Sequence, residues 1–157
     1  MKRRNFLNQS SLGMTSILVA PHVMGCSSKA QGSAAARKNS PYVISTWNVA
    51  EANSIAGKAL ENGVNALDAA VAGVAFEEAN IQNTTVGKGG APDRDGNVTL
   101  DACVMNHHGD CGAVLAVENI THVAALAKDV MEHTPHVILA GAGARKFALE
   151  RGYTPEE

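Results

Sequence analysis

The residues best suited to phosphate binding lie in a glycine-rich stretch, residues 86–93, which reads VGKGGAPD. A phosphate-binding Walker loop has two glycines separated by four residues, then lysine and serine or threonine, between a strand and a helix. Lys88 is misplaced for that pattern, and no helix is predicted after it. We interpret Gly87, Gly89 and Gly90 as residues that give the backbone room to turn or to approach another segment closely.

The histidines are poor candidates for metal binding or catalysis. His107 and His108 are adjacent in a predicted turn, where we expect neighbouring side chains to diverge, whereas a metal needs convergent ligands. His122, His133 and His136 lie near predicted helix ends and a strand start, without a serine or cysteine partner that the sequence identifies. We therefore predict no metal site and no catalytic triad.

A cofactor site is also not predicted. The stretch LAGAGARK, residues 139–146, is superficially similar to a dinucleotide-binding turn. It lacks the third glycine and an acidic residue at the required distance.

Two other pairs of residues, one of threonines and one of cysteines, remain to be interpreted. Thr84 and Thr85 offer hydroxyls beside the glycine-rich stretch, but no activating base is evident, so they are taken as loop residues. Cys103 and Cys111 flank a polar turn. They either pair in an oxidising compartment or serve as two small buried hydrophobic residues, and the sequence leaves both open.

The single tryptophan, Trp47, lies in the stretch YVISTWNVA, residues 42–50. The β-branched residues before it predict a strand over residues 42–47. Small apolar residues at helical spacing predict a helix over residues 52–60, ended by Gly63. Asn65 is the predicted cap of a second helix, with Asp68 three residues later. Its predicted buried stripe consists of Leu67, Ala70, Val71, Val74 and Ala75.

The second half of the chain predicts a hairpin followed by alternating helices and a strand. Residues 97–105 and 111–117 are predicted strands joined by the polar turn 106–110. A helix beginning near Thr121 should end at Thr134-Pro135, because proline disfavours helix in the preceding residue. A buried strand over residues 136–141 and a short helix over residues 144–151 complete the pattern. The face predicted for the helix after Thr121 consists of Val123, Leu126, Ala127, Val130 and Met131.

The composition favours layered α/β packing built from small side chains. Aromatic residues make up 4% of the chain and the formal net charge is −2, with no basic patch interleaved with aromatics. Nucleic-acid binding is therefore not predicted.

The first residues predict an exported protein. Residues 1–26 combine a basic start, including Arg3-Arg4, with a short apolar run, which is typical of a signal peptide. The arginine pair resembles a twin-arginine signal, with an ordinary Sec signal as the alternative. The stretch VMGC resembles a bacterial lipobox, in which Cys26 would be lipidated; a plain cleaved signal is the alternative. Residues 27–40 are a predicted flexible linker, and residues 41–157 form the domain, which we expect in the periplasm or cell envelope.

Several motifs, in order, resemble those of one enzyme family. The stretches STWN, ALENGVNALDAAVAG, TVGKGGAPDRDGNVTLDACVM and GAVLAVENITHVAALAKDVMEHTPHVILAG are similar to the N-terminal α subunit of glycosylasparaginases. The resemblance covers nearly all of residues 41–157. It implies the N-terminal half of an αββα sandwich of the N-terminal-nucleophile (Ntn) hydrolase superfamily.

The resemblance also implies a mechanism and a partner. In this family a precursor cuts itself into α and β chains, and the new N-terminal threonine of β attacks the side-chain amide of glycosylated asparagine. The reaction releases aspartate and needs neither metal nor cofactor. The implied partners are the β subunit, the glycosylated asparagine substrate and, in an assembly, a dimer of αβ units.

Carried over residue by residue, the resemblance assigns few site residues to this chain. The sequence ends at Glu157, before the family's His-Asp-Thr junction, so we expect no catalytic residue here and no activity from this chain alone. Trp47 matches a tryptophan that walls the substrate pocket, with a core or interface role as the alternative. Gly87, Gly89 and Gly90 match the family's loop and are interpreted as structural, with an active-site role as the alternative.

Three functions remain open from the sequence. The first is an α subunit or truncated precursor of a glycosylasparaginase that degrades glycoprotein remnants. The second is a plain or isoaspartyl asparaginase of the same superfamily. The third is a non-catalytic, lipid-anchored fragment or pseudoenzyme.

Overall fold

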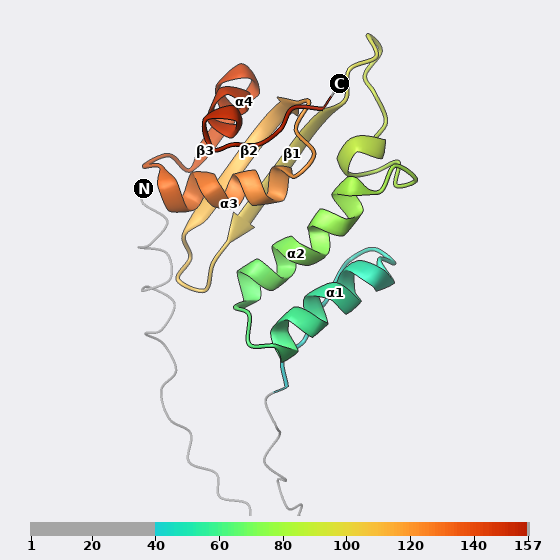
Figure 1. The fold of residues 1–157 in the computed structure, drawn as a ribbon, viewed down its shortest axis with the longest axis vertical. Coiled ribbons are helices and arrows are strands. Elements are labelled where there is room, and N and C mark those ends of the chain that lie inside the picture. The colour runs from blue at the N-terminus through green and yellow to red at the C-terminus, as the bar shows by residue number, and fades with distance from the viewer. Residues whose placement is uncertain (1–39, 157) are drawn as a thin grey trace, which may run out of the picture. The chain divides into compact units, whose positions relative to one another are not determined.

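The computed structural model describes residues 40–156, which belong to one compact unit of the chain (Figure 1). The predicted signal peptide, Cys26 and the linker up to residue 39 lie outside the described residues. Within residues 40–156, no helix has the length and apolar character needed to cross a bilayer. The elements are α1 (Ala50–Glu61), α2 (Ala66–Ala79), the 3-10 turn η2 (Gly87–Gly89), β1 (Thr99–Met105), β2 (Cys111–Glu118), α3 (Val123–His133), β3 (Ile138–Ala140) and α4 (Gly141–Glu150).

The helices α1 and α2 lie side by side and are joined by a tight turn (Figure 1). Gly63 has a φ of +81°, and the Val64 N–H donates to the Ala59 carbonyl at 3.0 Å, which closes α1 as a Schellman motif. The Asn65 side chain then caps α2 by accepting from the Asp68 N–H at 2.9 Å. Both predicted caps are confirmed.

Small residues let these two helices approach closely. Ala52, Ala56, Ala69 and Gly73 are buried between them. A Cβ added at Gly73 would lie 2.6 Å from the Ala52 carbonyl oxygen, which is too short for a real contact. The abundance of alanine and glycine in this region therefore has a direct packing cause.

The three strands form one mixed sheet in the order β1-β2-β3. β1 and β2 are antiparallel and joined by the predicted hairpin, in which the Asn106 N–H donates to the Asp110 carbonyl at 3.0 Å and Gly109 has a φ of +87°. β3 runs parallel to β2 after the crossover through α3, which ends at the extended residue Thr134, as predicted.

One face of the sheet is covered by helices and forms the core. Leu126, Ala127 and Val130 of α3 and Ala144 and Ala148 of α4 are all buried in one cluster with the sheet. Most of the predicted face of α3 is confirmed, although Met131 is half-buried. The sheet contributes Val114 and Val117, which are fully buried, and Leu100, Ala102, Val104 and Leu139, which are half-buried.

The opposite face of the sheet is uncovered by any described residue. Cys103, Ala113 and Ile138 are direct partners across the three strands, so their side chains share this face. Met105 of β1 is 63% exposed and Ile138 of β3 is 53% exposed. The prediction of a buried strand over residues 136–141 is therefore wrong in this respect, since β3 is short and lies at an edge. The described part of the chain thus has two layers, one of helices and one of strands. The face of the sheet away from the helices exposes apolar side chains.

Two further predictions need correction. Residues 42–47 form no strand, because no described segment pairs with them, and residues 46 and 47 lie in a bend; Tyr42 and Ile44 are 82% and 90% exposed. The predicted stripe of α2 is not its buried side, since α1 packs against Ala69 and Gly73 instead. Of that stripe, Ala70 and Val74 are exposed, whereas Leu67, Val71 and Ala75 are half-buried.

Candidate functional site

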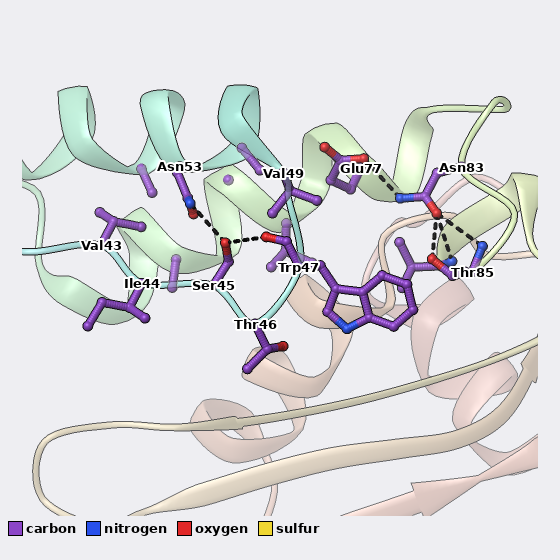
Figure 2. Close-up of a pocket in the computed structure, with 16 residues that line it drawn as sticks. Val43, Ile44, Ser45, Thr46, Trp47, Val49, Asn53, Glu77, Asn83 and Thr85 are labelled. Carbon is purple, nitrogen blue, oxygen red and sulfur yellow. Dashed lines mark hydrogen bonds between the residues drawn. The ribbon is translucent and has the colours of Figure 1, made fainter.

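Trp47 lines an open groove with a volume of about 420 Å³ (Figure 2). The groove lies between the segment around Trp47, the helices α1 and α2, and the loop that carries Thr85. Its floor is apolar and is formed by small residues such as Ala56 and Gly73. Polar side chains at its rim are those of Ser45, Thr46, Asn53, Glu77, Asn83 and Thr85.

The position of Trp47 is fixed by a turn with two side-chain contacts. The Ser45 hydroxyl donates to the Trp47 carbonyl at 2.8 Å, and the Asn53 side-chain amide donates to the Ser45 hydroxyl at 2.8 Å. The Val49 N–H donates to the same Trp47 carbonyl at 2.9 Å. The indole ring is left 64% exposed, and Figure 2 shows it extending toward the loop of Thr85. A rigid backbone thus presents a large, exposed aromatic ring.

The opposite rim is built around Asn83. Its side-chain oxygen accepts from the Thr85 N–H at 3.0 Å, the Thr85 hydroxyl at 2.7 Å and the Val86 N–H at 3.3 Å. Its side-chain amide donates to the Glu77 carboxylate at 2.9 Å. The sequence did not predict that Thr85 and Trp47 line the same groove.

The three glycines of the loop allow close backbone approach within this chain. Gly87 is buried with a φ of +68°, and a Cβ added there would overlap the backbone of Glu78. A Cβ at Gly89 would overlap the Asn83 carbonyl, and one at Gly90 would lie 3.0 Å from the Gly87 carbonyl. The interpretation of these residues as structural agrees with their packing. A direct role in a site stays a prediction.

Behind the loop, Glu78 is a buried carboxylate that the sequence did not single out. It is 3% exposed; one of its oxygens accepts from the Ala124 N–H at 2.8 Å, and the other lies 3.2 Å from His122 Nδ1. Burial raises the pKa of the Glu78 carboxyl, while the hydrogen bonds from Ala124 and His122 act in the opposite direction. Glu78 thus joins the end of α2 to the start of α3.

The last described residues contact the same region. The Thr121 hydroxyl donates to the Glu156 carboxylate at 2.6 Å, and Lys88 Nζ lies 3.6 Å from the other Glu156 oxygen. These contacts lower the pKa of the Glu156 carboxyl, the Thr121 hydrogen bond most of all. Lys88, which the Walker comparison had considered for phosphate binding, therefore has a carboxylate partner.

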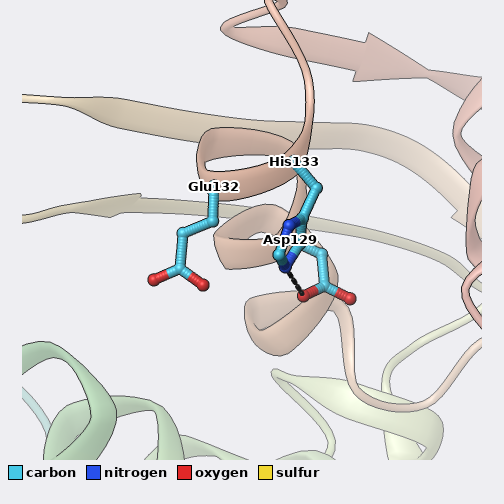
Figure 3. Close-up of side chains that lie close together, drawn as sticks. All are labelled: Asp129, Glu132 and His133. Atoms are coloured by element: carbon cyan, nitrogen blue, oxygen red, sulfur yellow. Dashed lines mark ion pairs between the residues drawn. The ribbon is translucent and has the colours of Figure 1, made fainter.

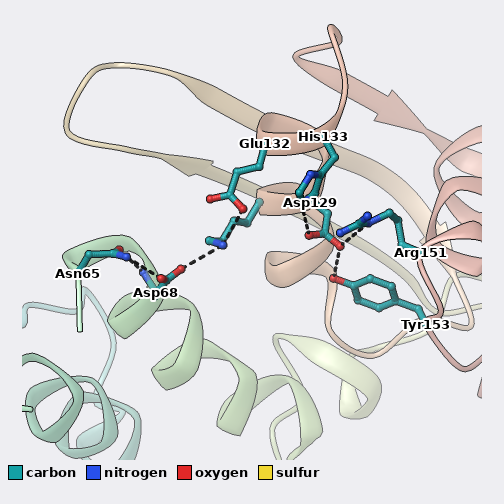
Figure 4. Close-up of polar contacts among 8 residues, drawn as sticks. Asn65, Asp68, Asp129, Glu132, His133, Arg151 and Tyr153 are labelled. Atoms are coloured by element: carbon teal, nitrogen blue, oxygen red, sulfur yellow. Dashed lines mark hydrogen bonds and ion pairs between the residues drawn. The ribbon is translucent and has the colours of Figure 1, made fainter. Parts of the chain in front are cut away.

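On α3, Asp129, Glu132 and His133 lie close together (Figure 3). Figure 4 shows why these carboxylates do not require a cation. Asp129 accepts from Arg151 at 3.3 Å and from the Tyr153 hydroxyl at 3.2 Å, while Lys128 donates to Glu132 at 2.8 Å. The same Lys128 lies 3.1 Å from Asp68 and so links α3 to α2. Burial raises the pKa of the Tyr153 hydroxyl, and the neighbouring Asp129 carboxylate raises it further.

The remaining sequence candidates are placed apart from the groove. The rings of His107 and His108 lie with centroids 3.7 Å apart at the hairpin tip, so the expectation that they diverge is wrong. Cys103 and Cys111 are free; Cys103 is exposed and Cys111 half-buried, so neither is a fully buried hydrophobic residue.

The groove provides walls for a bound molecule rather than a complete set of reacting groups. Among residues 40–156, no hydroxyl or thiol hydrogen-bonds to the side chain of a histidine or a lysine; the Thr134 hydroxyl contacts only the backbone of His136 and Val130. An exposed aromatic ring, an apolar floor and a polar rim are typical of a surface that orients a small ligand.

Comparison with known proteins identifies the family. Residues 16–157 match the model of the asparaginase family named Asparaginase_2. The N(4)-(beta-N-acetylglucosaminyl)-L-asparaginase of Elizabethkingia miricola is 41% identical over 155 residues, which are 98% of this chain and 45% of that protein.

Two further relatives, matched over a shorter part of this chain, bear two different names. The N(4)-(beta-N-acetylglucosaminyl)-L-asparaginase of Rattus norvegicus is 41% identical over 118 residues, which are 74% of this chain and 34% of that protein. The probable isoaspartyl peptidase/L-asparaginase 3 of Arabidopsis thaliana is 39% identical over 113 residues, 71% of this chain and 32% of that protein. This chain therefore spans less than half the length of these relatives. By its match over most of its length, the chain belongs to the asparaginase family.

Proposed function

We propose that residues 41–157 supply the α portion of an amidohydrolase that cleaves the bond between N-acetylglucosamine and asparagine and releases aspartate. The similarity to proteins named N(4)-(beta-N-acetylglucosaminyl)-L-asparaginase supports this substrate. The observation that carries the proposal is the Trp47 groove. It combines an exposed aromatic ring with a polar rim, and its lining contains no nucleophile paired with a base.

A second segment is the proposed partner. The sheet leaves one face open, with Met105, Leu115 and Ile138 each more than 40% exposed, and such a surface favours coverage by another layer. The relatives are more than twice as long as the part of them that this chain matches. We propose that a β segment, produced by self-cleavage of a precursor, covers this face and brings an N-terminal threonine to the groove. Two such αβ units can then form a dimer.

The chemistry assigned to the threonine is nucleophilic attack on the amide carbon. Its own α-amino group takes the hydroxyl proton, an acyl-enzyme forms as the glycosylamine leaves, and water then releases aspartate. Trp47 would hold the substrate during both steps. No described residue of this chain takes a proton in this scheme, so we expect residues 41–157 alone to be inactive.

The test uses this chain together with its β segment, which we call the assembled enzyme. Release of aspartate is measured from N-acetylglucosaminyl-asparagine, free asparagine and an isoaspartyl dipeptide. The proposal expects the highest kcat/KM for the glycosylated substrate. Faster turnover of free asparagine or the isoaspartyl dipeptide would instead support the alternative for which the Arabidopsis relative is named. No turnover of any of the three would favour a non-catalytic fragment.

Export to the periplasm or cell envelope is a separate proposal. It rests on the basic and apolar start of the sequence, including Arg3-Arg4, and on the lipobox-like VMGC stretch at Cys26. Mass spectrometry of the mature N-terminus tests it, because a lipidated Cys26 adds acyl chains. A protein that retains residues 1–25 and remains in the cytoplasmic fraction would contradict export.

A further inference from the structure

The two consecutive glutamates at the end of α2 have different partners. Glu78 is buried and contacts the start of α3, whereas Glu77 lines the Trp47 groove and accepts from Asn83 at 2.9 Å (Figure 2). Glu77 therefore ties the loop that carries Thr85 to a rigid helix. This pair has no role in the mechanism proposed above.

The hydrogen bonds define the orientation of the Asn83 side chain. Two backbone N–H groups, those of Thr85 and Val86, point at one of its terminal atoms, so that atom must be the oxygen. The other terminal atom is then the amide nitrogen, which faces the acceptor-only carboxylate of Glu77. Each partner thus confirms the assignment made from the other.

This orientation also fixes the role of the Thr85 hydroxyl. It lies 2.7 Å from the Asn83 oxygen, which only accepts, so the hydroxyl proton must point at Asn83. The lone pairs of the Thr85 oxygen are left to face away from Asn83. Because Thr85 is exposed and lines the groove, its oxygen is available to a ligand as an acceptor.

We propose that Asn83, anchored by Glu77, is a positioning residue that presents the Thr85 hydroxyl oxygen as an acceptor for an N–H or O–H donor of the substrate bound beside Trp47. The inference rests on the proposed function. It assigns positioning roles to Asn83 and Glu77 and a direct substrate contact to Thr85. Asn83 acts only through Thr85, so its effect must disappear when the Thr85 hydroxyl is absent.

A double-mutant cycle in the assembled enzyme tests this dependence. Thr85→Val removes the hydroxyl at similar volume, and Asn83→Ala removes its orienting acceptor. Each is expected to lower kcat/KM about tenfold, the effect of about one hydrogen bond. The double variant should be no slower than Thr85→Val alone, whereas two independent structural effects would multiply to about a hundredfold.

A charge exchange gives a second readout. Asn83→Asp places a carboxylate against that of Glu77 and should lower kcat/KM, because the donor between the two is lost. When Asn83→Asp is combined with Glu77→Gln, the new amide at position 77 can donate to the new carboxylate at position 83, so the hydrogen bond is restored with its direction reversed. Recovery to within about threefold of the wild type is expected, a difference smaller than one typical hydrogen bond.

Asn106→Ala is the matched control. Asn106 makes the same kind of turn at the hairpin tip: its oxygen accepts from the N–H groups of His108 and Asp110, and its amide donates to the Asp110 carboxylate at 2.8 Å. It does not line the groove, so its replacement should leave kcat/KM unchanged. The double-mutant cycle can also be measured without turnover, from the dissociation constant of L-aspartate for each variant by calorimetry.

The outcomes separate the two proposals. An active wild type whose Asn83→Ala variant is unchanged, or whose double variant loses activity multiplicatively, overturns the positioning inference alone. Loss of activity in Asn106→Ala equal to that in Asn83→Ala also overturns it. A wild type that neither turns over the three substrates nor binds L-aspartate overturns the proposed function, and with it the inference.

Discussion

Glu78 of α2 caps the N-terminus of α3 by accepting a hydrogen bond from the Ala124 N–H at 2.8 Å. The residue that precedes α3, His122, provides no side-chain cap of its own and instead lies 3.2 Å from Glu78. A carboxyl group can fill this place in either protonation state, because the first amides of a helix lack intrahelical partners and a carboxyl oxygen accepts a hydrogen bond even when the group carries a proton. The Glu78 side chain therefore connects the pair of helices α1 and α2 to α3, which packs on the sheet.

Replacing Glu78 should reveal this connection through its pH dependence. Burial raises the pKa of Glu78 above its ordinary value of 4.5, so the folded state binds the proton more tightly than the unfolded state. The proton on Glu78 therefore contributes its full stabilisation of the folded state below the pKa that Glu78 has in the unfolded state. This contribution is lost as the pH rises through the higher pKa of Glu78 in the folded state. The free energy of unfolding of the wild type, relative to Glu78→Gln, should fall over that window and then level off.

Urea denaturation of the assembled enzyme, from about pH 4 to about pH 8, measures this difference. Glu78→Ala is the companion variant, since it removes the cap at every pH and should cost about 1–3 kcal/mol. A relative stability that increases with pH would show that the carboxylate, and not the acid, is the form favoured by folding.

Gly87→Ala should destabilise the protein strongly. The residue has a φ of +68°, and the new Cβ would overlap the Glu78 backbone, so we expect a loss of about 3 kcal/mol or more. Gly96→Ala is the matched control: Gly96 also has a positive φ, +92°, but nothing lies within 4 Å of the added Cβ. Its cost should be only about 1 kcal/mol. Equal melting temperatures for the two variants would contradict the packing argument.

Trp47→Ala should weaken the substrate interaction without unfolding the chain. The ring is 64% exposed, so its removal leaves no buried cavity, while the loss of an aromatic contact to substrate should cost about 2 kcal/mol, roughly thirtyfold in kcat/KM. Trp47→Phe should retain part of the activity. Steady-state kinetics with the glycosylated substrate provides the measurement, and wild-type kcat/KM in Trp47→Ala would place the ring outside the substrate site.

The thiol of Cys103 should report coverage of the open sheet face. It is exposed on the face shared with Ala113 and Ile138. In the folded assembled enzyme we expect it to react with maleimide at least about tenfold more slowly than in the same enzyme unfolded in urea, because thiolate chemistry requires access. Cys111→Ser removes the second described thiol from the measurement. Equal rates in both forms would argue against a partner on this face.

Residues 41–157 expressed alone should aggregate or fold poorly. The uncovered face and the two sheet edges expose apolar side chains and unpaired backbone groups that attract other chains. Light scattering and thermal denaturation test this expectation. A monomer with a sharp cooperative transition would show that the unit is stable without its proposed partner.

Local signals in the sequence were sufficient for most elements. Gly63 and Asn65 fix the turn between α1 and α2 through contacts within a few residues, and the hairpin at Asn106–Asp110 is equally local. The segment before Trp47 was misjudged because a β-branched run predicts an extended backbone, but a strand also needs a neighbour.

The site was predictable only in part, for the same reason. Glu78 and His122 are 44 residues apart, and no periodicity links them. A glutamate in an apolar helix close to its C-terminus, where the helix dipole disfavours it, was the one available signal that Glu78 has a special partner. The pairing of Thr85 with the Trp47 groove depends on how α2 directs the following loop, which the sequence alone does not specify.

Trp47 is the only tryptophan of this chain, so its fluorescence can report on the groove. Because Trp47 lies exposed at the rim, its emission should be that of a water-exposed fluorophore, and a molecule that covers the ring should shift the spectrum to shorter wavelength. Within this polypeptide no second indole obscures that signal. Occupancy of the groove can therefore be followed in real time, without a label and before any bond is broken.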